Sequence, residues 1–156
     1  MAVPRQLCTF MLDGMLFGID VVSVQEVIRH QAVTKVPLAS SVVRGLINLR
    51  GQIVTAIDMR ARLGAAPTSS LEPPMNVVLC TNDGVVSLLV DEIGDVLDVD
   101  ARDFEPSPEG LSGVFREVVL GVYKLEGWLL LLLDAERVVT LGDQLEARQE
   151  SGSVAA

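Results

Sequence analysis

Apolar residues in this 156-residue chain come in short runs, and three pairs of runs are separated by only two residues. The separating dipeptides are Asp13-Gly14, Asp83-Gly84 and Glu126-Gly127. Asp-Gly between apolar runs is a strong hairpin signal, because both central residues of such a turn adopt positive φ, and Glu-Gly is a weaker version. The pattern therefore predicts three β-hairpins, over residues 7–19, 76–90 and 118–133.

Two of the predicted strands are apolar on both faces. Val85–Val90 continues its apolar residues on both sides, and Leu129–Leu133 shows no alternation at all. Such strands are typical of positions covered on two sides. Cys8 and Cys80 also fall in apolar runs with no Cys-x-x-Cys spacing, which predicts buried, reduced thiols.

Helical segments are predicted to be few and short, at Ser41–Gly45, Met59–Leu63 and Ala135–Leu141. Residues 65–74 are rich in proline, serine and threonine and form the clearest boundary within the chain. We therefore expect a single domain over residues 1–141, made of two similar halves at roughly 6–64 and 75–141. Residues 142–156 are polar and then small, and we expect a flexible tail.

The two halves resemble each other in sequence at a constant offset of 76 residues. Four pairs are identical, and each half ends an apolar strand at an aspartate that is expected to N-cap a short helix. This pattern predicts two small β-barrels related by duplication, with chance similarity between glycine-bounded hairpins as the alternative. The identical pairs are Gly45/Gly121, Leu49/Leu125, Gly51/Gly127 and Asp58/Asp134.

Composition and charge narrow the class of protein. Hydrophobic residues make up 49% of the chain and aromatic residues only 4%, so Val, Leu and Ile fill the core and favour an all-β fold. The net charge of −9 argues against nucleic acid as a partner. Residues 29–62 carry a net +5 and residues 91–109 a net −7. This asymmetry either orients protein partners or is ordinary solvated charge.

Catalytic machinery is missing from the sequence. His30 is the only histidine, expected at the surface of a strand end, so a Ser-His-Asp or Cys-His arrangement has no buried base. No Gly-x-Gly-x-x-Gly or Walker A motif is present to hold phosphates. The residues predict neither an enzyme nor a cofactor.

One segment resembles a calcium-binding loop but departs from it at two key positions. Asp98, Asp100 and Glu109 match loop positions 1, 3 and 12. Arg102 places a cation inside the loop, and Asp103 stands where the sharp turn requires glycine. We therefore expect no metal site.

The chain start has no signal-peptide h-region, and the longest apolar run, Trp128–Leu133, is too short to span a bilayer. These features predict a soluble, cytoplasmic protein without direct membrane insertion.

Three segments, in this order and at this spacing, resemble the CheW family. Residues 18–28 contain Val-Gln-Glu-Val, residues 43–60 contain Asn-Leu-Arg-Gly, and residues 88–108 begin with Leu-Leu-Val-Asp. Together they are specific, and the resemblance covers roughly residues 7–141. Two departures stand in or near the loop associated with kinase contact: Leu38-Ala39-Ser40-Ser41 lacks a usual second proline, and Thr55-Ala56 replaces a common Pro-Val.

The resemblance implies two intertwined SH3-like five-stranded β-barrels with a shared apolar core and a few short helices. It implies a non-catalytic scaffold adaptor that couples methyl-accepting chemoreceptors to a CheA-type histidine kinase. The implied partners are the kinase regulatory domain and the cytoplasmic tip of the receptor. A scaffold of another chemosensory-type pathway (gliding, pili or second-messenger output) and a self-assembling structural module are the alternatives, and weak self-association stays open.

The receptor-binding residues implied by the resemblance are Val24, Glu26 and Arg50. Val24 and Glu26 lie two apart, so they are expected on one face of a strand. Arg50 is expected to extend into the groove between the barrels, where its planar guanidinium suits a carboxylate. The alternatives are that Val24 is core, and that Glu26 and Arg50 are merely solvated.

The kinase-binding residues implied by the resemblance are Val33, Val36 and Pro37, in a loop whose apolar residues are costly to expose. Packing of this loop on the first barrel is the alternative. Gly45, Gly51 and Gly127 are interpreted as backbone requirements rather than contacts.

Overall fold

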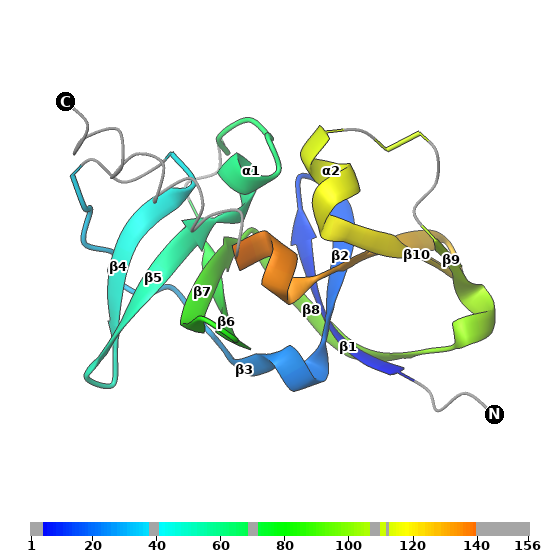
Figure 1. Ribbon diagram of the computed structural model, residues 1–156, viewed down its shortest axis with the longest axis horizontal. Helices are drawn as coiled ribbons and strands as arrows, with labels where there is room; N and C mark the ends of the chain where they lie inside the picture. Colours follow the sequence, from blue (N-terminus) through cyan, green and yellow to red (C-terminus); the bar gives the residue numbers. More distant parts are fainter. Residues whose placement is uncertain (1–4, 38–40, 69–71, 107–109, 112, 140–156) are drawn as a thin grey trace.

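The computed structural model describes residues 5–37, 41–68, 72–106, 110–111 and 113–139. Within these residues the protein is almost entirely β-structure, with short helices at the connections (Figure 1). This confirms the all-β fold class predicted from the aliphatic composition and the hairpin turns.

The strands form two sheets, which we call the first and second barrels. The first barrel has the strand order β3-β6-β7-β5-β4, and the second has β8-β1-β2-β11-β10-β9. The strands of the first barrel are β3 (Val24–Ile28), β4 (Val43–Leu49), β5 (Gln52–Asp58), β6 (Met75–Thr81) and β7 (Gly84–Val90). Those of the second are β1 (Arg5–Leu12), β2 (Met15–Asp20), β8 (Glu92–Val99), β9 (Phe104–Pro106), β10 (Val119–Leu125) and β11 (Trp128–Leu133).

The two barrels exchange hairpins. The β1–β2 hairpin, from the first half of the sequence, lies in the second barrel, and the β6–β7 hairpin lies in the first. When β1, β2 and β8 are matched to β6, β7 and β3, the two strand orders are the same apart from β9. The predicted five strands therefore describe the first barrel, whereas the second has β9 as a sixth. Neither sequence half forms a barrel from its own strands alone.

The repeated hairpins β4–β5 and β10–β11 share their irregularities. The register shifts between Val43 and Gly45, and again between Val119 and Gly121. A Cβ added at Gly45 would lie 2.2 Å from the Thr34 carbonyl oxygen, and one at Gly121 would lie 2.5 Å from that of Glu105. The internal similarity at an offset of 76 therefore extends to backbone geometry.

Two of the three predicted helices are present. Helix α1 (Met59–Arg62) follows β5, and Asp58 caps it by accepting hydrogen bonds from the N–H groups of Arg60 and Ala61. Residues 135–139 are helical, and Asp134 accepts from the N–H of Arg137; residues 140–141 lie outside the described part of the chain. Helix α2 (Gly113–Val118) was not predicted.

The predicted helix at Ser41–Gly45 is wrong. Residues from Val43 onward form β4, whose buried residues Gly45, Ile47 and Leu49 alternate as a strand requires. Gly45 has φ of 153°, which is incompatible with a helix and fits the bulge at this point.

The apolar core is shared between the barrels, as predicted. The largest cluster of buried residues joins Phe10, Phe17 and Ile19 of the second barrel to Leu79 and Leu88 of the first. Phe10 and Phe17 stack with ring centroids 5.8 Å apart. This common core makes the two barrels one packed unit.

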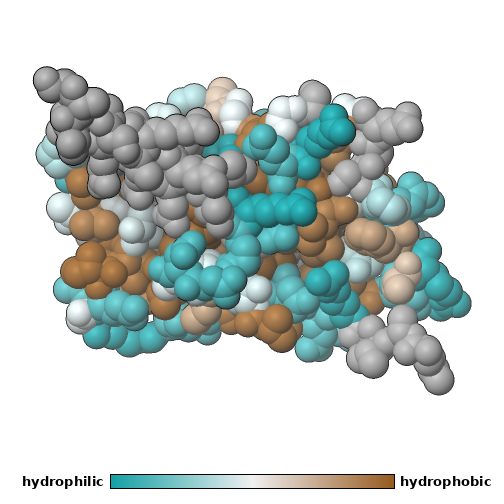
Figure 2. Space-filling model, in the orientation of Figure 1, coloured by the Kyte–Doolittle hydropathy of each residue, from teal (hydrophilic) through white to brown (hydrophobic). Residues whose placement is uncertain are grey.

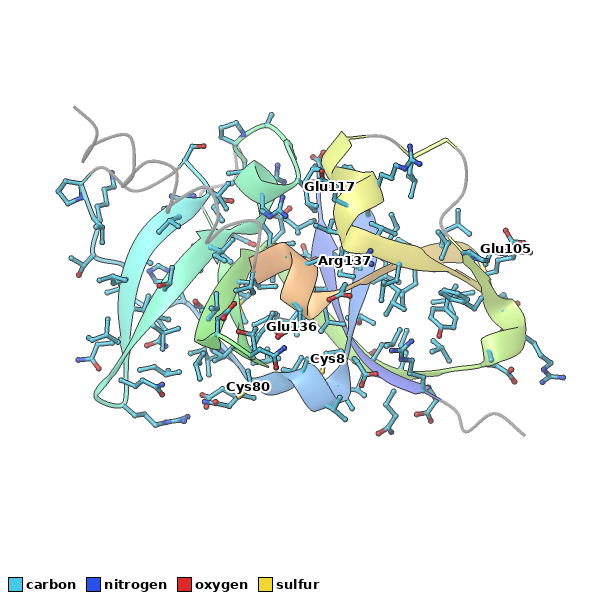
Figure 3. The ribbon with its side chains drawn as sticks, in the orientation of Figure 1. Cys8, Cys80, Glu105, Glu117, Glu136 and Arg137 are labelled. Atoms are coloured by element: carbon cyan, nitrogen blue, oxygen red, sulfur yellow. The ribbon has the colours of Figure 1, made fainter. Side chains whose placement is uncertain are left out.

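Two burial predictions need correction. The β11 strand is not covered along its whole length, because Trp128 and Leu129 are 52% and 60% exposed where the hairpin extends beyond the core. Cys80 is exposed, since it lies at the turn end of β6, whereas Cys8 is buried as predicted (Figure 3).

Candidate functional site

Arg50 and Glu26 are paired with each other. The Arg50 guanidinium donates two hydrogen bonds to the Glu26 carboxylate, both of 2.7 Å. Glu26 lies on β3 and Arg50 in the turn after β4, and these are the two edge strands of the first barrel. The pair therefore closes this barrel where no strand-to-strand ladder joins its edges among the described residues.

The backbone at Arg50 holds its side chain in an uncommon direction. Arg50 has φ of 53° and Gly51 has φ of 86°, so the β4–β5 turn has two positive-φ residues in succession. Such turns match the twist of a hairpin but favour Asn or Gly at the first position. The Asn48 side chain stabilises the turn by accepting a hydrogen bond of 2.8 Å from the Gly51 N–H. Left-handed backbone at a bulky residue is enriched at functional sites.

The pair is anchored on one side and open on the other. The Glu26 side chain is 18% exposed, whereas that of Arg50 is 73% exposed. Hydrogen bonds from Arg50 lower the pKa of Glu26, so the carboxylate is ionised at neutral pH. Arg50 has five N–H donors and uses two on Glu26, which leaves donors accessible to a partner carboxylate.

The predicted placement of Arg50 in the groove between the barrels is not what the structure shows. Its ion-pair partner, Glu26, belongs to the same barrel. The sequence suggested a long side chain free to extend, and the positive-φ turn instead directs it across the first barrel.

Val24 lies two residues before Glu26 and is partly buried. A bulge falls between Val24 and Glu26, so strict alternation does not apply between them. Both are nonetheless half-buried, whereas Gln25 and Val27 are exposed. Val24 packs against the shared core, which agrees in part with the alternative that it is a core residue.

The loop predicted to contact the kinase divides into a packed part and an exposed part. Val33 packs against the buried cluster inside the first barrel, and Thr34 exchanges two backbone hydrogen bonds of 2.8 Å with Leu46. Val36 is 39% exposed and Pro37 is exposed. The structure therefore favours the packing alternative for Val33 and leaves Val36 and Pro37 accessible. Residues 38–40 lie outside the described part.

The three glycines predicted to have backbone roles all have positive φ. Gly45 also meets the Thr34 carbonyl, whereas nothing lies within 4 Å of a Cβ added at Gly51 or Gly127. Gly45 is therefore required by close approach as well as by conformation.

Several exposed aliphatic side chains were not singled out from the sequence. Val22 is 85% exposed in the short helical turn η1 (Val21–Ser23), and Ile53 is 63% exposed just after the Arg50 turn. Val27, at 39%, follows Glu26 directly. Figure 2 shows hydrophobic side chains at the surface over β4 and β5. The polar residues beside Ile53 in the turn were the sequence signal for its exposure, because a strand that starts in a turn exposes its first residues.

The candidate calcium loop is used for other contacts. Asp100 accepts hydrogen bonds from the backbone and the side chain of Arg102, and Glu109 lies outside the described residues. No group of metal-ligating side chains occurs in the described part of the chain. His30 is exposed as predicted, two residues beyond the end of β3. In that same part, no helix combines the length and apolar character needed to cross a bilayer.

A known protein family matches nearly the whole chain. The model of the CheW-like domain matches residues 6–142, which is most of the chain. The chain belongs to the CheW family. This is a family of non-catalytic adaptors, so the lack of a catalytic constellation in the sequence has its explanation in the family.

Individual CheW proteins are similar over nearly the whole chain. Chemotaxis protein CheW of Rhizobium meliloti is 32% identical over 134 residues, covering 86% of each protein. That of Bacillus subtilis is 30% identical, also covering 86% of each. The crystal structure of the scaffolding protein TtCheW from Thermoanaerobacter tengcongensis superposes with a TM-score of 0.79 at 25% identity, covering 87% of this chain and 92% of that one.

Proposed function

We propose that this protein is a cytoplasmic scaffold adaptor that couples methyl-accepting chemoreceptors to a CheA-type histidine kinase. Its partners are then the cytoplasmic tip of the receptor and the regulatory domain of the kinase. Membership of a family whose named members are chemotaxis and scaffolding proteins supports this role.

The observation that carries the proposal is the Arg50–Glu26 pair on the rim of the first barrel. A half-buried carboxylate holds an exposed guanidinium in one direction, so its free donors are preorganised for a partner carboxylate. Exposed Val27 and Ile53 are near the pair in the sequence and supply apolar area. An oriented charge beside apolar contacts suits a small, transient interface.

A second face is proposed at Val36 and Pro37. Thr34, two residues before Val36, pairs with Leu46 in the middle of β4, whereas Arg50 follows the end of that strand. The four residues from Leu46 to Arg50 span about 13 Å, which leaves room for two separate contact surfaces. Receptor contact is assigned to Val24, Glu26 and Arg50, and kinase contact to Val36 and Pro37, with Val33 supporting the loop from below.

The test is a pair of substitutions measured against both partners by calorimetry. Glu26→Arg places two cations together on the receptor face, and like charges in an interface cost several kcal/mol. Receptor binding should be lost while kinase binding persists. Val36→Asp puts an unpaired charge into the proposed apolar contact and should do the opposite.

The charge-swapped double variant Glu26→Arg/Arg50→Glu is the matched control. It keeps an ion pair at the same place and should melt near the wild type, yet it presents a carboxylate where the receptor meets a guanidinium. Receptor binding should therefore stay lost. If the swap restores binding, the pair is only structural, and if Glu26→Arg and Val36→Asp weaken both partners equally, the assignment of two faces is wrong.

A further inference from the structure

Arg60 of α1 connects the first barrel to the second. Its guanidinium donates to both oxygens of Asp91, through Nε at 2.8 Å and Nη2 at 2.6 Å. Nη1 donates to the Ala66 carbonyl at 2.8 Å and lies 3.6 Å from the Asp13 carboxylate, and the Asp13 N–H donates to Asp91 at 3.0 Å. We call Arg60, Asp91 and Asp13 the α1 clamp.

The partners of Arg60 mark the junction between the barrels. Asp91 is the single residue between β7 of the first barrel and β8 of the second, so the chain crosses from one to the other there. Asp13 lies in the β1–β2 turn, which belongs to the second barrel. One guanidinium thus holds the crossover and a hairpin of the opposite barrel together.

An equivalent contact occurs in the other half of the repeat. Glu136, 76 residues after Arg60, lies in the helical segment 135–139 that follows β11. Its carboxylate accepts hydrogen bonds of 2.6 and 3.2 Å from the N–H of Asn82, in the β6–β7 turn of the first barrel. Figure 3 shows Glu136 at the middle of the molecule, between the two sheets. We call this contact the C-terminal clamp.

The two clamps are related by the internal repeat, although their charges are opposite. In each clamp, the helix at the end of one sequence half contacts the turn of a hairpin. That hairpin comes from the same half of the sequence but lies in the other barrel. Arg62 of α1 adds a bond of 3.0 Å to the Val138 carbonyl, and it is 5% exposed. Polar contacts therefore cross the boundary between the two barrels at three places. Figure 2 shows hydrophilic side chains gathered over the middle of this face.

Apolar packing alone does not explain what fixes the angle between the barrels. The shared core holds them together, but the hydrophobic effect is non-directional. Arg60 also lines two surface clefts of about 250 and 200 Å³, so the boundary between the barrels is open to solvent beside it. Bidentate ion pairs, by contrast, are directional.

We propose that Arg60 and Glu136 are positioning residues that set the angle between the two barrels and so allow one bound partner to influence the other. The first part concerns the free protein alone. The second part rests on the proposed function, because it requires receptor and kinase fragments to bind. Hydrogen bonds from Arg60 lower the pKa of Asp91, so this carboxylate is ionised at neutral pH.

The angle is tested on the free protein by electron-spin distance measurement. Spin labels on Gln52→Cys and Glu126→Cys report on the β4–β5 and β10–β11 turns, one in each barrel, in a Cys8→Ala/Cys80→Ser background. Arg60→Gln and Glu136→Ala should each broaden the distance distribution, and together they should broaden it by about twofold or more. Arg60→Lys keeps the charge but cannot form the bidentate pair, so it should narrow the distribution only partly relative to Arg60→Gln.

Matched controls separate the clamps from general effects of losing an ion pair. Arg44→Gln removes an Arg–Asp pair that does not join the barrels, because Arg44 bonds Asp58 at 2.8 Å within the first barrel. Arg137→Ala removes the neighbour of Glu136. The Arg137 side chain pairs with Asp134 of the same segment and not with the other barrel. Both should leave the distribution unchanged. If Arg60→Gln and Glu136→Ala also leave it unchanged in folded protein, the shared core sets the angle and the proposal is wrong.

The coupling is tested with a receptor-tip fragment and a kinase regulatory domain encoded in the same genome. In the wild type, saturating one should change the affinity for the other by about fivefold or more, within the usual range of coupling between sites. Arg60→Gln should bring that factor close to one while each partner alone binds within about twofold of wild type. Coupling that survives in Arg60→Gln would overturn this part. Failure of the wild type to bind either fragment would contradict the proposed function and leave the distance result standing.

Discussion

At the scale of single residues, the structure unites two side chains that the sequence presented separately. Glu26 and Arg50 were both predicted as receptor contacts from the motifs around them. Their mutual pairing depends on β3 and β4 coming together as the edges of one barrel, which spacing alone does not reveal. The positive φ of Arg50 was equally hidden, because Arg-Gly is a poor match to the usual turn dipeptides.

Arg50→Asn separates the turn from the ion pair. Asn tolerates positive φ, so the β4–β5 turn should form as before, while the guanidinium is lost. We expect cooperative unfolding at pH 7 with a small loss of stability from the missing ion pair, and a strong loss of receptor binding, both measured on the same preparation. Arg50→Ala is the comparison, since it also strains the turn and should melt at a lower temperature than Arg50→Asn.

The contribution of the pair to stability should depend on pH. Arg50 lowers the pKa of Glu26 from its ordinary value of 4.5, so folding favours the ionised carboxylate. The stabilisation is present above that value and is lost as the pH falls through the lower, folded-state pKa. Denaturant unfolding of wild type and Arg50→Asn should therefore differ at pH 7 and converge at acidic pH. A difference that grows as the pH falls would contradict the pairing.

At the scale of elements, turn dipeptides and capping residues predicted the hairpins and helix starts that short-range interactions determine. The three hairpins, α1 and the two aspartate caps follow from turn dipeptides and capping rules, and all are present. The predicted helix at Ser41–Gly45 failed because Gly45 is selected by contact with Thr34, a partner outside the segment. Tertiary context overrode propensity there, and α2 was missed because its six residues carry too weak a pattern.

Gly45→Ala tests this close approach. The added Cβ would lie 2.2 Å from the Thr34 carbonyl oxygen at a backbone φ of 153°, so strain and overpacking combine. We expect a loss of about 3–5 kcal/mol in the free energy of unfolding, measured with urea.

Gly127→Ala is the matched control for that substitution. Gly127 has φ of 79° with nothing within 4 Å of the added Cβ, so only backbone strain applies. Its cost should be about 1–2 kcal/mol. Equal losses at the two positions would show that conformation alone explains Gly45.

At the scale of the whole molecule, the exchange of hairpins makes the barrels interdependent. Composition and turn spacing predicted two small barrels, and the resemblance implied that they are intertwined. Which hairpin belongs to which barrel was beyond the sequence, because equivalent strands from the two halves carry nearly the same pattern and are locally interchangeable. The tertiary pairing of β2 with β11, and of β7 with β5, decides it.

The exchange predicts that the barrels unfold together. Trp128 is the only tryptophan and lies in the second barrel, while a fluorophore on Gln52→Cys (with both native cysteines replaced) reports on the first. Both signals should give the same urea midpoint, as a two-state domain requires. Two separated midpoints would mean that the barrels are independent units despite their shared core.

A scaffold adaptor of this kind must join a receptor to a kinase. The most direct measurement is co-sedimentation of a full-length CheA-type kinase with vesicles that carry its receptor, with and without this protein. We predict that the kinase sediments only when the protein is present, and that Glu26→Arg and Val36→Asp each abolish this by removing a different contact. A kinase that stays in the supernatant with the wild-type protein, or that sediments equally well with both variants, would contradict the proposed function.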